Sequence, residues 1–339
     1  MDRLIRDGHK VKIITARYPG ATGYELCDGA EYYRIGNRYT VYLKARQLFK
    51  SKLKNWADVI IDEMNTLPFG VAYYTSTRTI LLNYQLAREV WFYQMPFPIS
   101  LVGYLFEPFM LRSMAKKYPL VATESLSTKK DLNKYSFKDV RTFRVGIALN
   151  PLEELPIKLN PSTVLSLGAI RPMKRTLDAV KSFEVAKSKM PALQMIIAGS
   201  DGGKYATEVK KYIAQSPYSD SIIVMGRVTP EKRIELMKDA AVILVTSIKE
   251  GWGLIVTEAA SQGTPAIVYD TDGLRDSVRH NITGIVSKNN DYKVMGNEIF
   301  NLLKDNTKYN LMRLNGWQWS KEFTFENSYG DFLKVINNK

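Results

Sequence analysis

The chain has 339 residues, of which 45% are hydrophobic and 24% are charged, and its formal net charge is +14. At roughly 100–200 residues per domain, this length predicts two domains, each able to bury a core without disulfides. The single cysteine, Cys27, excludes an internal disulfide and favours a reducing compartment, so we expect a cytoplasmic protein. The basic excess indicates an anionic partner, but no zinc-finger spacing, basic heptad or RNA-binding signature accompanies it, which argues against nucleic acid.

The start of the chain carries charges where a secretory signal would be apolar. No uncharged run reaches the length of about 18 residues needed to span a bilayer. The most apolar segment, residues 90–110, is rich in aromatic side chains but contains Glu107 and three prolines. Two interpretations stay open for it: a surface segment lying at a membrane interface, or a loop and helix packed in a cleft between domains.

Short β-branched runs alternate with amphipathic stretches along the chain. The predicted strands cover residues 11–15, 58–62, 79–82, 120–123, 164–168, 194–199, 222–224, 241–245 and 265–269. Helices are predicted between them, including 176–189 and 230–239. Apolar strands that alternate with helices indicate parallel sheets buried on both faces. The fold class is therefore α/β, with two Rossmann-like domains whose parallel sheets face a cleft, and the Pro-rich segment 150–161 marks the boundary.

The opening of the chain departs from this plan. Residues 4–9 indicate the end of a helix that stops at Gly8, and the next strand begins near Lys10. A doubly wound sheet begins with a central strand and a Gly-rich turn, and neither precedes this helix. We interpret this as a start codon placed too far downstream or a shortened sequence, with a variant fold as the alternative.

One stretch in the second half predicts an anion site. A buried strand leads into a turn over residues 250–253, and a helix follows over 254–262. The backbone N–H groups of Gly253, Leu254 and Ile255 would point at a phosphate, whose charge the helix dipole favours. The glycines of the turn let the backbone approach such a ligand closely.

Two glutamates flank this turn and helix. Glu250 lies in the turn and Glu258 lies about one turn into the helix, so both side chains could face one ligand. Carboxylates accept hydrogen bonds from paired sugar hydroxyls. The alternative is that both are solvated surface charges, which is the common state of glutamate.

Residues 250–259, together with 263–265 and 273–276, resemble the donor signature of the family-four retaining glycosyltransferases, also called glycosyl transferases group 1. That family has the GT-B fold. The resemblance implies an N-terminal acceptor-side domain over 1–150, a donor domain over 151–320 and a C-terminal helix over 321–339 that crosses back. It covers most of the chain, more weakly in the N-terminal half.

The resemblance also implies a role for each residue of the motif. Glu250 would contact hydroxyls of the donor sugar near the reacting centre, and Glu258 would bind the ribose hydroxyls. The residues that would shape the sugar pocket or hold the diphosphate through their amides are Gly251, Trp252, Gly253, Leu254 and Ile255.

A second match follows the predicted strand that ends at Gly168. In the family, the next loop supplies an Arg and a Lys to the diphosphate, and Lys174 falls at the Lys position. The usual Arg position is Ala169 here, so Arg171, or else Arg175, would take over the role. The alternative for these basic residues is that they are charges of a loop that caps a helix.

Acceptor chemistry is where the resemblance is weakest. Many relatives carry a His after the strand predicted at 79–82, whereas this chain has Asn83, Tyr84 and Gln85. The chain's two histidines, His9 and His280, lie elsewhere in the sequence.

A metal site is conceivable at Asp270 and Asp272, because two close carboxylates suit Mg²⁺ or Mn²⁺. We expect no metal and no other cofactor, since basic residues and a helix N-terminus already balance the phosphate charge. The expected co-substrate is a nucleotide-diphosphate sugar of the UDP or GDP type.

The sequence therefore predicts a retaining, metal-independent hexosyltransferase that acts on a glycan or a lipid-linked acceptor. Peripheral contact with an anionic membrane, at the cytoplasmic face, follows from the net charge and the segment 90–110. One alternative is a catalytically silent sugar-binding or scaffold relative. Another is a dinucleotide-dependent oxidoreductase, although no G-x-G-x-x-G follows any predicted strand.

Overall fold

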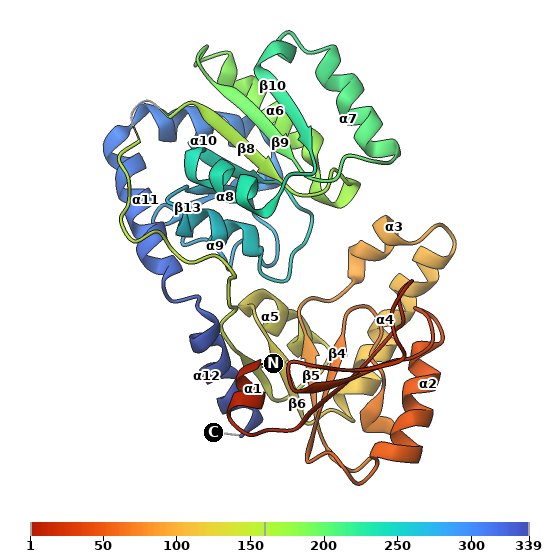
Figure 1. The fold of residues 1–339 in the computed structure, drawn as a ribbon. Coiled ribbons are helices and arrows are strands. Elements are labelled where there is room, and N and C mark those ends of the chain that lie inside the picture. Colours follow the sequence, from red (N-terminus) through yellow and green to blue (C-terminus); the bar gives the residue numbers. More distant parts are fainter. Residues whose placement is uncertain (1, 159–160, 338–339) are drawn as a thin grey trace.

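The structure is a computed structural model that describes residues 2–158 and 161–337. The chain forms two lobes, and both ends of the chain lie in the N-terminal lobe (Figure 1). The predicted boundary segment 150–161 includes residues 159–160, and the predicted first and last domains include residues 1 and 338–339; these positions lie outside the described residues. The predicted domain limits therefore stay a prediction.

The C-terminal lobe is built on one parallel sheet with the strand order β10-β9-β8-β11-β12-β13. Its strands are β8 (Thr163–Leu167), β9 (Gln194–Ala198), β10 (Ile222–Gly226), β11 (Val242–Val245), β12 (Ala266–Tyr269) and β13 (Gly284–Ser287). Its helices are α6 (Thr176–Lys187), α7 (Lys204–Ala214), α8 (Pro230–Asp239), α9 (Leu254–Ser261), α10 (Tyr292–Lys304) and α11 (Asn306–Ser320). Two separate apolar clusters contain its buried strand residues. Burial on both faces explains why the sequence of the inner strands is almost continuously apolar.

The N-terminal lobe contains two sheets instead of the single sheet expected of a Rossmann-like domain. The first is β1-β3-β2 and the second is β4-β5-β6-β7. The strands are β1 (Val11–Thr15), β2 (Tyr24–Cys27), β3 (Ala30–Arg34), β4 (Val59–Met64), β5 (Arg78–Asn83), β6 (Leu120–Thr123) and β7 (Val140–Thr142). No ladder joins the two sheets within the described residues. The fold is α/β as predicted, but not every strand is parallel, because β2 pairs with β3 antiparallel.

The helical parts of this lobe are α1 (Asp2–Arg6), α2 (Val41–Leu48), η1 (Phe49–Leu53), η2 (Val71–Tyr73), η3 (Arg88–Val90), α3 (Trp91–Gln94), α4 (Ile99–Ala115) and α5 (Leu126–Lys134). The last helix, α12 (Phe325–Ile336), returns from the C-terminal lobe and packs here (Figure 1). The ring of Phe332 lies 5.2 Å from that of Phe143, and Asp331 accepts a hydrogen bond from Arg144 at 2.6 Å. One chain segment thus crosses between the lobes near residue 150 and a second crosses near residue 322.

The apolar segment 90–110 forms α3 and most of α4, and its outer side chains face solvent. Phe97 is 79% exposed and Phe109 is 68% exposed. Val102, Leu105 and Phe106 are exposed as well. The interpretation that this segment packs in the cleft between the domains is therefore wrong for these side chains.

Glu107 holds the α3–α4 hairpin to the lobe. It is 1% exposed, and its carboxylate accepts hydrogen bonds from the backbone N–H groups of Ala87 and Arg88 at 2.9 and 2.7 Å. It also accepts one from Trp91 Nε1 at 3.0 Å, and the Arg88 guanidinium lies 3.7 Å away. A charge buried in an apolar helix is tolerable here because donors surround it.

We expect Glu107→Ala to lower the free energy of unfolding by roughly 3–5 kcal/mol, because buried donors and Arg88 lose their partner. Urea unfolding followed by circular dichroism would measure this. The matched control is Glu89→Ala at an exposed position of η3, which should change stability by at most about 0.5 kcal/mol. Equal stability of the two variants would contradict the anchoring role of Glu107.

Candidate active site

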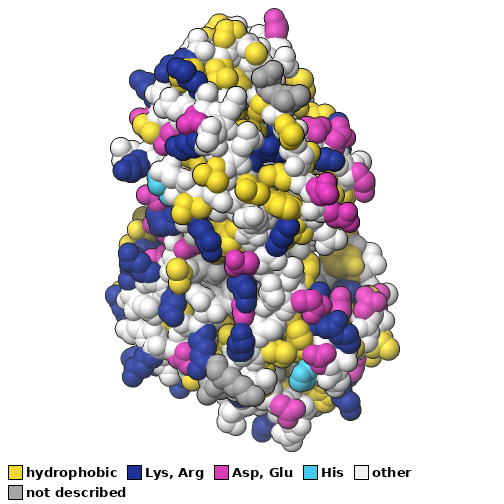
Figure 2. Space-filling view, turned by 90° about the vertical axis from the view of Figure 1, so that its left-hand side faces the viewer, with side chains coloured by type: hydrophobic (Ala, Val, Ile, Leu, Met, Phe, Trp, Pro, Cys, Tyr) yellow, Lys and Arg dark blue, Asp and Glu magenta, His cyan; other side chains and the backbone are white. Residues whose placement is uncertain are grey.

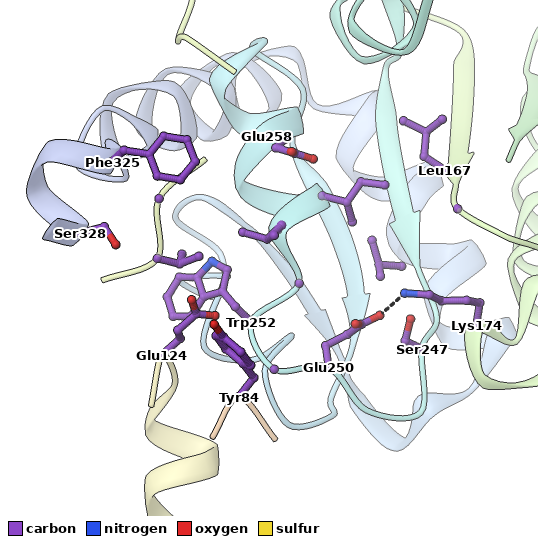
Figure 3. A pocket seen from close by; sticks show the side chains of 18 of the residues that line it. Tyr84, Glu124, Leu167, Lys174, Ser247, Glu250, Trp252, Glu258, Phe325 and Ser328 are labelled. Carbon is purple, nitrogen blue, oxygen red and sulfur yellow. Dashed lines mark hydrogen bonds and ion pairs between the residues drawn. The ribbon is translucent and has the colours of Figure 1, made fainter. Parts of the chain in front are cut away.

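A cavity of about 900 Å³ lies between the two lobes. The C-terminal lobe contributes the ends of β8 and β11 and the start of α9, and the N-terminal lobe contributes the ends of β5 and β6 (Figure 3). The lining residues include Arg3, Tyr84, Glu124, Gly168, Ala169, Lys174, Arg233, Ser247, Glu250, Gly251, Trp252, Gly253, Leu254, Ile255, Glu258, Ser328 and Tyr329.

Lys174 and Glu250 meet in this cavity. The Lys174 ammonium donates a hydrogen bond to Glu250 Oε1 at 2.5 Å (Figure 3). The loop that carries Lys174 is fixed from the β11 side, because the hydroxyl of Thr246 donates to the carbonyl oxygens of Lys174 and Arg175. The structure thus brings together a lysine and a glutamate that lie 76 positions apart in the sequence.

The N-terminus of α9 opens onto the same cavity. Gly253 precedes the helix with φ at 89°, a backbone conformation that side chains other than that of glycine rarely adopt. A Cβ at this position would lie 2.8 Å from Leu274 Cδ2. Gly253, Leu254 and Ile255 all line the cavity. The first N–H groups of a helix have no acceptor within the helix, so they remain available to an anion.

Glu258 lies at the opposite end of the motif and is 6% exposed. Its Oε2 accepts a hydrogen bond from the guanidinium of Arg233 on α8. Burial raises the pKa of Glu258, and Arg233 acts in the opposite direction. The buried carboxylate is thereby held next to a cation that also lines the cavity.

Sequence analysis missed Arg233, although a local signal existed. The residue lies in the first turn of α8, where the side chain of Thr229 caps the helix. A cation in the first turn opposes the helix dipole, which favours anions there. An unfavourable charge of this kind points to a partner from another element, which here is Glu258.

The two other basic residues considered for the diphosphate lie differently. Arg171 is exposed and is not among the residues that line the cavity. Arg175 forms an ion pair with Asp178 at 2.7 Å and lies over the ring of Tyr269 at 5.0 Å. Of the three basic residues considered for phosphate binding, Lys174 lines the cavity and Arg171 and Arg175 do not. Arg233, which was not predicted, lines it as well.

Trp252 connects the motif to the return of the chain. Its ring lies 5.4 Å from that of Phe323, and its Nε1 donates to Thr257 Oγ1 at 2.9 Å. The side chain lines the cavity while it is held on its other side by aromatic packing. Its position therefore depends on where the chain crosses back towards α12.

The two aspartates considered as metal ligands are held by cations instead. Arg275 binds Asp270 at 2.7 Å and Asp272 at 2.5 Å, and Lys249 lies 3.3 Å from Asp272. Lys249 is buried and also binds Asp131 of α5 at 3.1 Å. Within the part of the chain that the structure describes, no group of three or more His, Cys, Asp or Glu side chains could hold a metal ion.

The N-terminal lobe supplies an acidic side chain and a tyrosine to the cavity. Glu124 follows the last residue of β6, and burial together with the charge of Glu63 raises its pKa to about 7. Tyr84 follows β5, and its carbonyl oxygen would lie 3.0 Å from a Cβ added at Gly251. Neither His9 nor His280 lines the cavity. In the sequence, Glu124 belongs to the weaker family resemblance of the N-terminal half, and no site role was predicted for it.

The basic side chains behind the net charge are spread out on the face that Figure 2 shows. The face shown in Figure 2 carries basic side chains over both lobes, interspersed with acidic and apolar ones. This face therefore presents no single basic patch for an extended anionic partner.

Comparison with known proteins assigns the second lobe. Residues 152–319 match the family model of the glycosyl transferases group 1. A D-inositol 3-phosphate glycosyltransferase of Acidothermus cellulolyticus is 25% identical over 178 residues, which are 50% of this chain and 40% of that protein. A poly(glycerol-phosphate) alpha-glucosyltransferase of Bacillus subtilis is 26% identical over 172 residues, 50% of this chain and 25% of that protein. The chain thus spans less than half the length of these curated relatives.

Solved structures resemble the chain over both lobes. A sucrose-phosphate synthase from Thermosynechococcus elongatus superposes with a TM-score of 0.80 at 17% identity, over 99% of this chain and 90% of that one. Anabaena HepE, solved with UDP and glucose, superposes with a TM-score of 0.71 at 14% identity, over 92% of this chain and 87% of that one. The likeness confirms the GT-B fold. Through the lobe that carries the Glu250–Glu258 motif, the chain belongs to the glycosyl transferases group 1 family.

Proposed function

We propose that this protein is a retaining, metal-independent glycosyltransferase that transfers a hexose from a nucleotide-diphosphate sugar. The observation that carries the proposal is the cavity wall of the C-terminal lobe. It combines two cations, Lys174 and Arg233, with the N-terminus of α9 and two carboxylates at its ends. Cations and helix N–H groups suit a diphosphate, and carboxylates suit sugar and ribose hydroxyls.

The donor would lie along this wall. Its diphosphate would sit between Lys174 and the start of α9, with the ribose at Glu258 and the sugar at Glu250. Lys174 is bound to Glu250, so a diphosphate would compete for the ammonium and release Glu250 for sugar hydroxyls. Glu250, Glu258 and Lys174 match the family's residues at these positions. The position at which the family has an Arg is Ala169 in this chain.

Catalysis would stabilise the charge that forms as the donor breaks. The bond between the anomeric carbon and the phosphate oxygen breaks, and its electron pair leaves with the nucleoside diphosphate. Lys174, Arg233 and the α9 dipole would stabilise that leaving group, which is why we propose no metal. The acceptor hydroxyl attacks from the same face, and its proton passes to the departing phosphate oxygen. Closure of the lobes would exclude water.

We expect one of UDP, GDP or ADP, or its sugar conjugate, to raise the melting temperature of the wild type. At a hundredfold excess over the dissociation constant, binding stabilises by about 2.7 kcal/mol. Glu258→Ala should lose the shift, because the ribose loses its acceptor and Arg233 loses its partner. The matched control is Glu208→Ala, an exposed position on α7, which should keep the shift. If no nucleotide shifted the wild type, the donor site would be disproved and the silent sugar-binding relative favoured.

We further propose that the acceptor is a glycan or a lipid-linked glycan, and that α3 and α4 rest on an anionic membrane. Val102, Leu105, Phe106 and Phe109 follow the helical pattern i, i+3, i+4 and i+7, so they form one exposed stripe along α4. A helix with an exposed apolar stripe suits the interface of a bilayer. Within residues 2–158 and 161–337, no helix is long and apolar enough to cross a bilayer.

Basic residues adjoin this stripe. Arg112 and Lys116 continue it at the C-terminal end of α4. The segment α2–η1 packs beside that end, since the ring of Phe49 lies 5.8 Å from Tyr74, and the neighbouring Tyr73 shares a hydrogen bond with Ser113 of α4. This segment exposes Lys44, Arg46, Lys50 and Lys52 and contains no acidic residue. Apolar insertion flanked by cations favours acidic lipids.

We expect the wild type to float with vesicles of phosphatidylglycerol at low salt and not with vesicles of phosphatidylcholine alone. Replacing Phe106 and Phe109 together by serine should weaken binding about tenfold or more, because two apolar side chains no longer enter the lipid. Leu311→Ser, an exposed position on α11 in the other lobe, should leave binding unchanged. A wild type that stays with the unbound fraction at low salt would refute the membrane contact.

A further inference from the structure

Glu124 is an unpartnered carboxylate in the wall that faces the proposed donor site. It stands at the carboxyl end of β6 and lines the cavity together with Tyr84, Trp252 and Glu250 (Figure 3). The other charged residues that line the cavity have ion-pair partners: Lys174 with Glu250, Arg233 with Glu258, and Arg3 with Glu326. Within residues 2–158 and 161–337, Glu124 has neither a hydrogen bond nor an ion pair.

The surroundings of Glu124 are anionic or neutral. Glu63 of β4 acts on it as a like charge, and Tyr84 at the end of β5 lies close enough for its own pKa to be raised by both carboxylates in addition to burial. The opposing C-terminal lobe presents the uncharged Trp252 and Gly251, and its two lining cations, Lys174 and Arg233, are paired with Glu250 and Glu258. Arg3 of α1 lines the same cavity, but Glu326 holds it at 2.7 Å. A partly buried carboxylate without a donor is costly, so its retention at a cavity wall suggests a ligand.

We infer that Glu124 binds the acceptor by accepting a hydrogen bond from one of its hydroxyls, and that the acceptor is an uncharged sugar or polyol around its attacking hydroxyl. The inference rests on the proposed glycosyltransferase function. The donor occupies the wall of the C-terminal lobe, so the acceptor must approach from the wall that carries Glu124. A carboxylate accepts from hydroxyl groups, whereas a phosphate or carboxylate beside the attacking hydroxyl would be repelled by Glu124 and Glu63.

The ionisation of Glu124 supplies a test that does not require the natural acceptor. Burial and Glu63 raise the pKa of Glu124 to about 7, so its carboxylate is formed as the pH rises through that value. Water takes the place of the acceptor hydroxyl in donor hydrolysis. The hydrolysis rate of the wild type should therefore increase between pH 6 and pH 8 with a midpoint near 7.

Two variants test whether the ionisation of Glu124 causes this pH dependence of the hydrolysis rate. Glu124→Gln should hydrolyse the donor about ten- to a hundredfold more slowly at pH 8, with no rise between pH 6 and pH 8 and an unchanged KM for the donor. Glu63→Gln removes the like charge but leaves Glu124, so it should move the midpoint to lower pH and keep the rate at pH 8. A Glu124→Gln variant with the wild-type rate and pH profile would overturn the inference.

Pairs of neutral and phosphorylated acceptors test directly whether the acceptor is uncharged around its attacking hydroxyl. The probes are myo-inositol against inositol 3-phosphate, glycerol against glycerol 3-phosphate, and N-acetylglucosamine against its 6-phosphate. Each is scored by how far it raises nucleotide release above hydrolysis. Higher release with neutral members supports the inference, and preference for phosphorylated members overturns it. If all probes are inert, the hydrolysis profiles decide.

The pH dependence of protein stability checks independently that Glu124 lacks a stabilising partner. Folding raises the pKa of this carboxyl, so the folded state binds a proton more tightly and loses stability as the pH rises from about 4.5 to about 7. Glu124→Gln removes this loss, so its melting temperature should exceed that of the wild type at pH 8 and not at pH 4. A variant less stable than the wild type at pH 8 would show that Glu124 has a stabilising partner. Failure of the donor function itself would appear separately, as a wild type that binds no nucleotide.

Discussion

The turn before α9 runs so close to its neighbours that a side chain on either of two glycines would displace backbone. A Cβ on Gly273 would lie 2.2 Å from the carbonyl oxygen of Glu250, and Gly273 has a φ of 79°. A Cβ on Gly251 would lie 3.0 Å from the carbonyl oxygen of Tyr84, in the other lobe. The first approach fixes the turn against the loop after β12, and the second presses it against the end of β5. These close approaches hold the turn that carries Glu250 and leads into α9. They also bring this turn against the N-terminal lobe at Tyr84.

Charge balance is the second constraint on the cavity. Taking a carboxylate out of water is costly unless a cation or several donors compensate it. Glu258 is buried and has Arg233, and Glu250 has Lys174. Each pair is local to the cavity, so a bound diphosphate can draw on both cations without a change of fold. The same pairing leaves neither carboxylate of this wall uncompensated.

The features that could be predicted from the sequence are those with a local signal. The strand, turn and helix around Glu250 and Glu258 occupy adjacent positions, so their order along the chain could be predicted. The roles of the two glutamates come from the family resemblance and stay a prediction. Arg233 and Glu124 reach the cavity from other elements, and sequence spacing carries no information on that. The antiparallel pair β2–β3 was missed because β2 is largely exposed and lacks an apolar run, although the turn at Asp28 and Gly29, both with positive φ, is typical of a hairpin. The separate sheets of the N-terminal lobe could not be foreseen either, because strand pairing depends on tertiary contacts.

The two walls of the cavity differ in the groups that they offer a ligand, and this difference gives the cleft a direction. The wall of the C-terminal lobe offers cations and helix N–H groups, while the opposite wall offers Glu124 with no free cation beside it among the described residues. A nucleoside diphosphate bound the wrong way round would place its phosphates against that carboxylate, so electrostatics alone would reject the reversed complex. The exposed stripe of α4 belongs to the same lobe as Glu124, and the chain runs from Tyr84 at the cavity directly into η3 and α3. An acceptor held at a lipid surface by its tail would therefore enter from the side where its hydroxyls, and not phosphates, are accommodated.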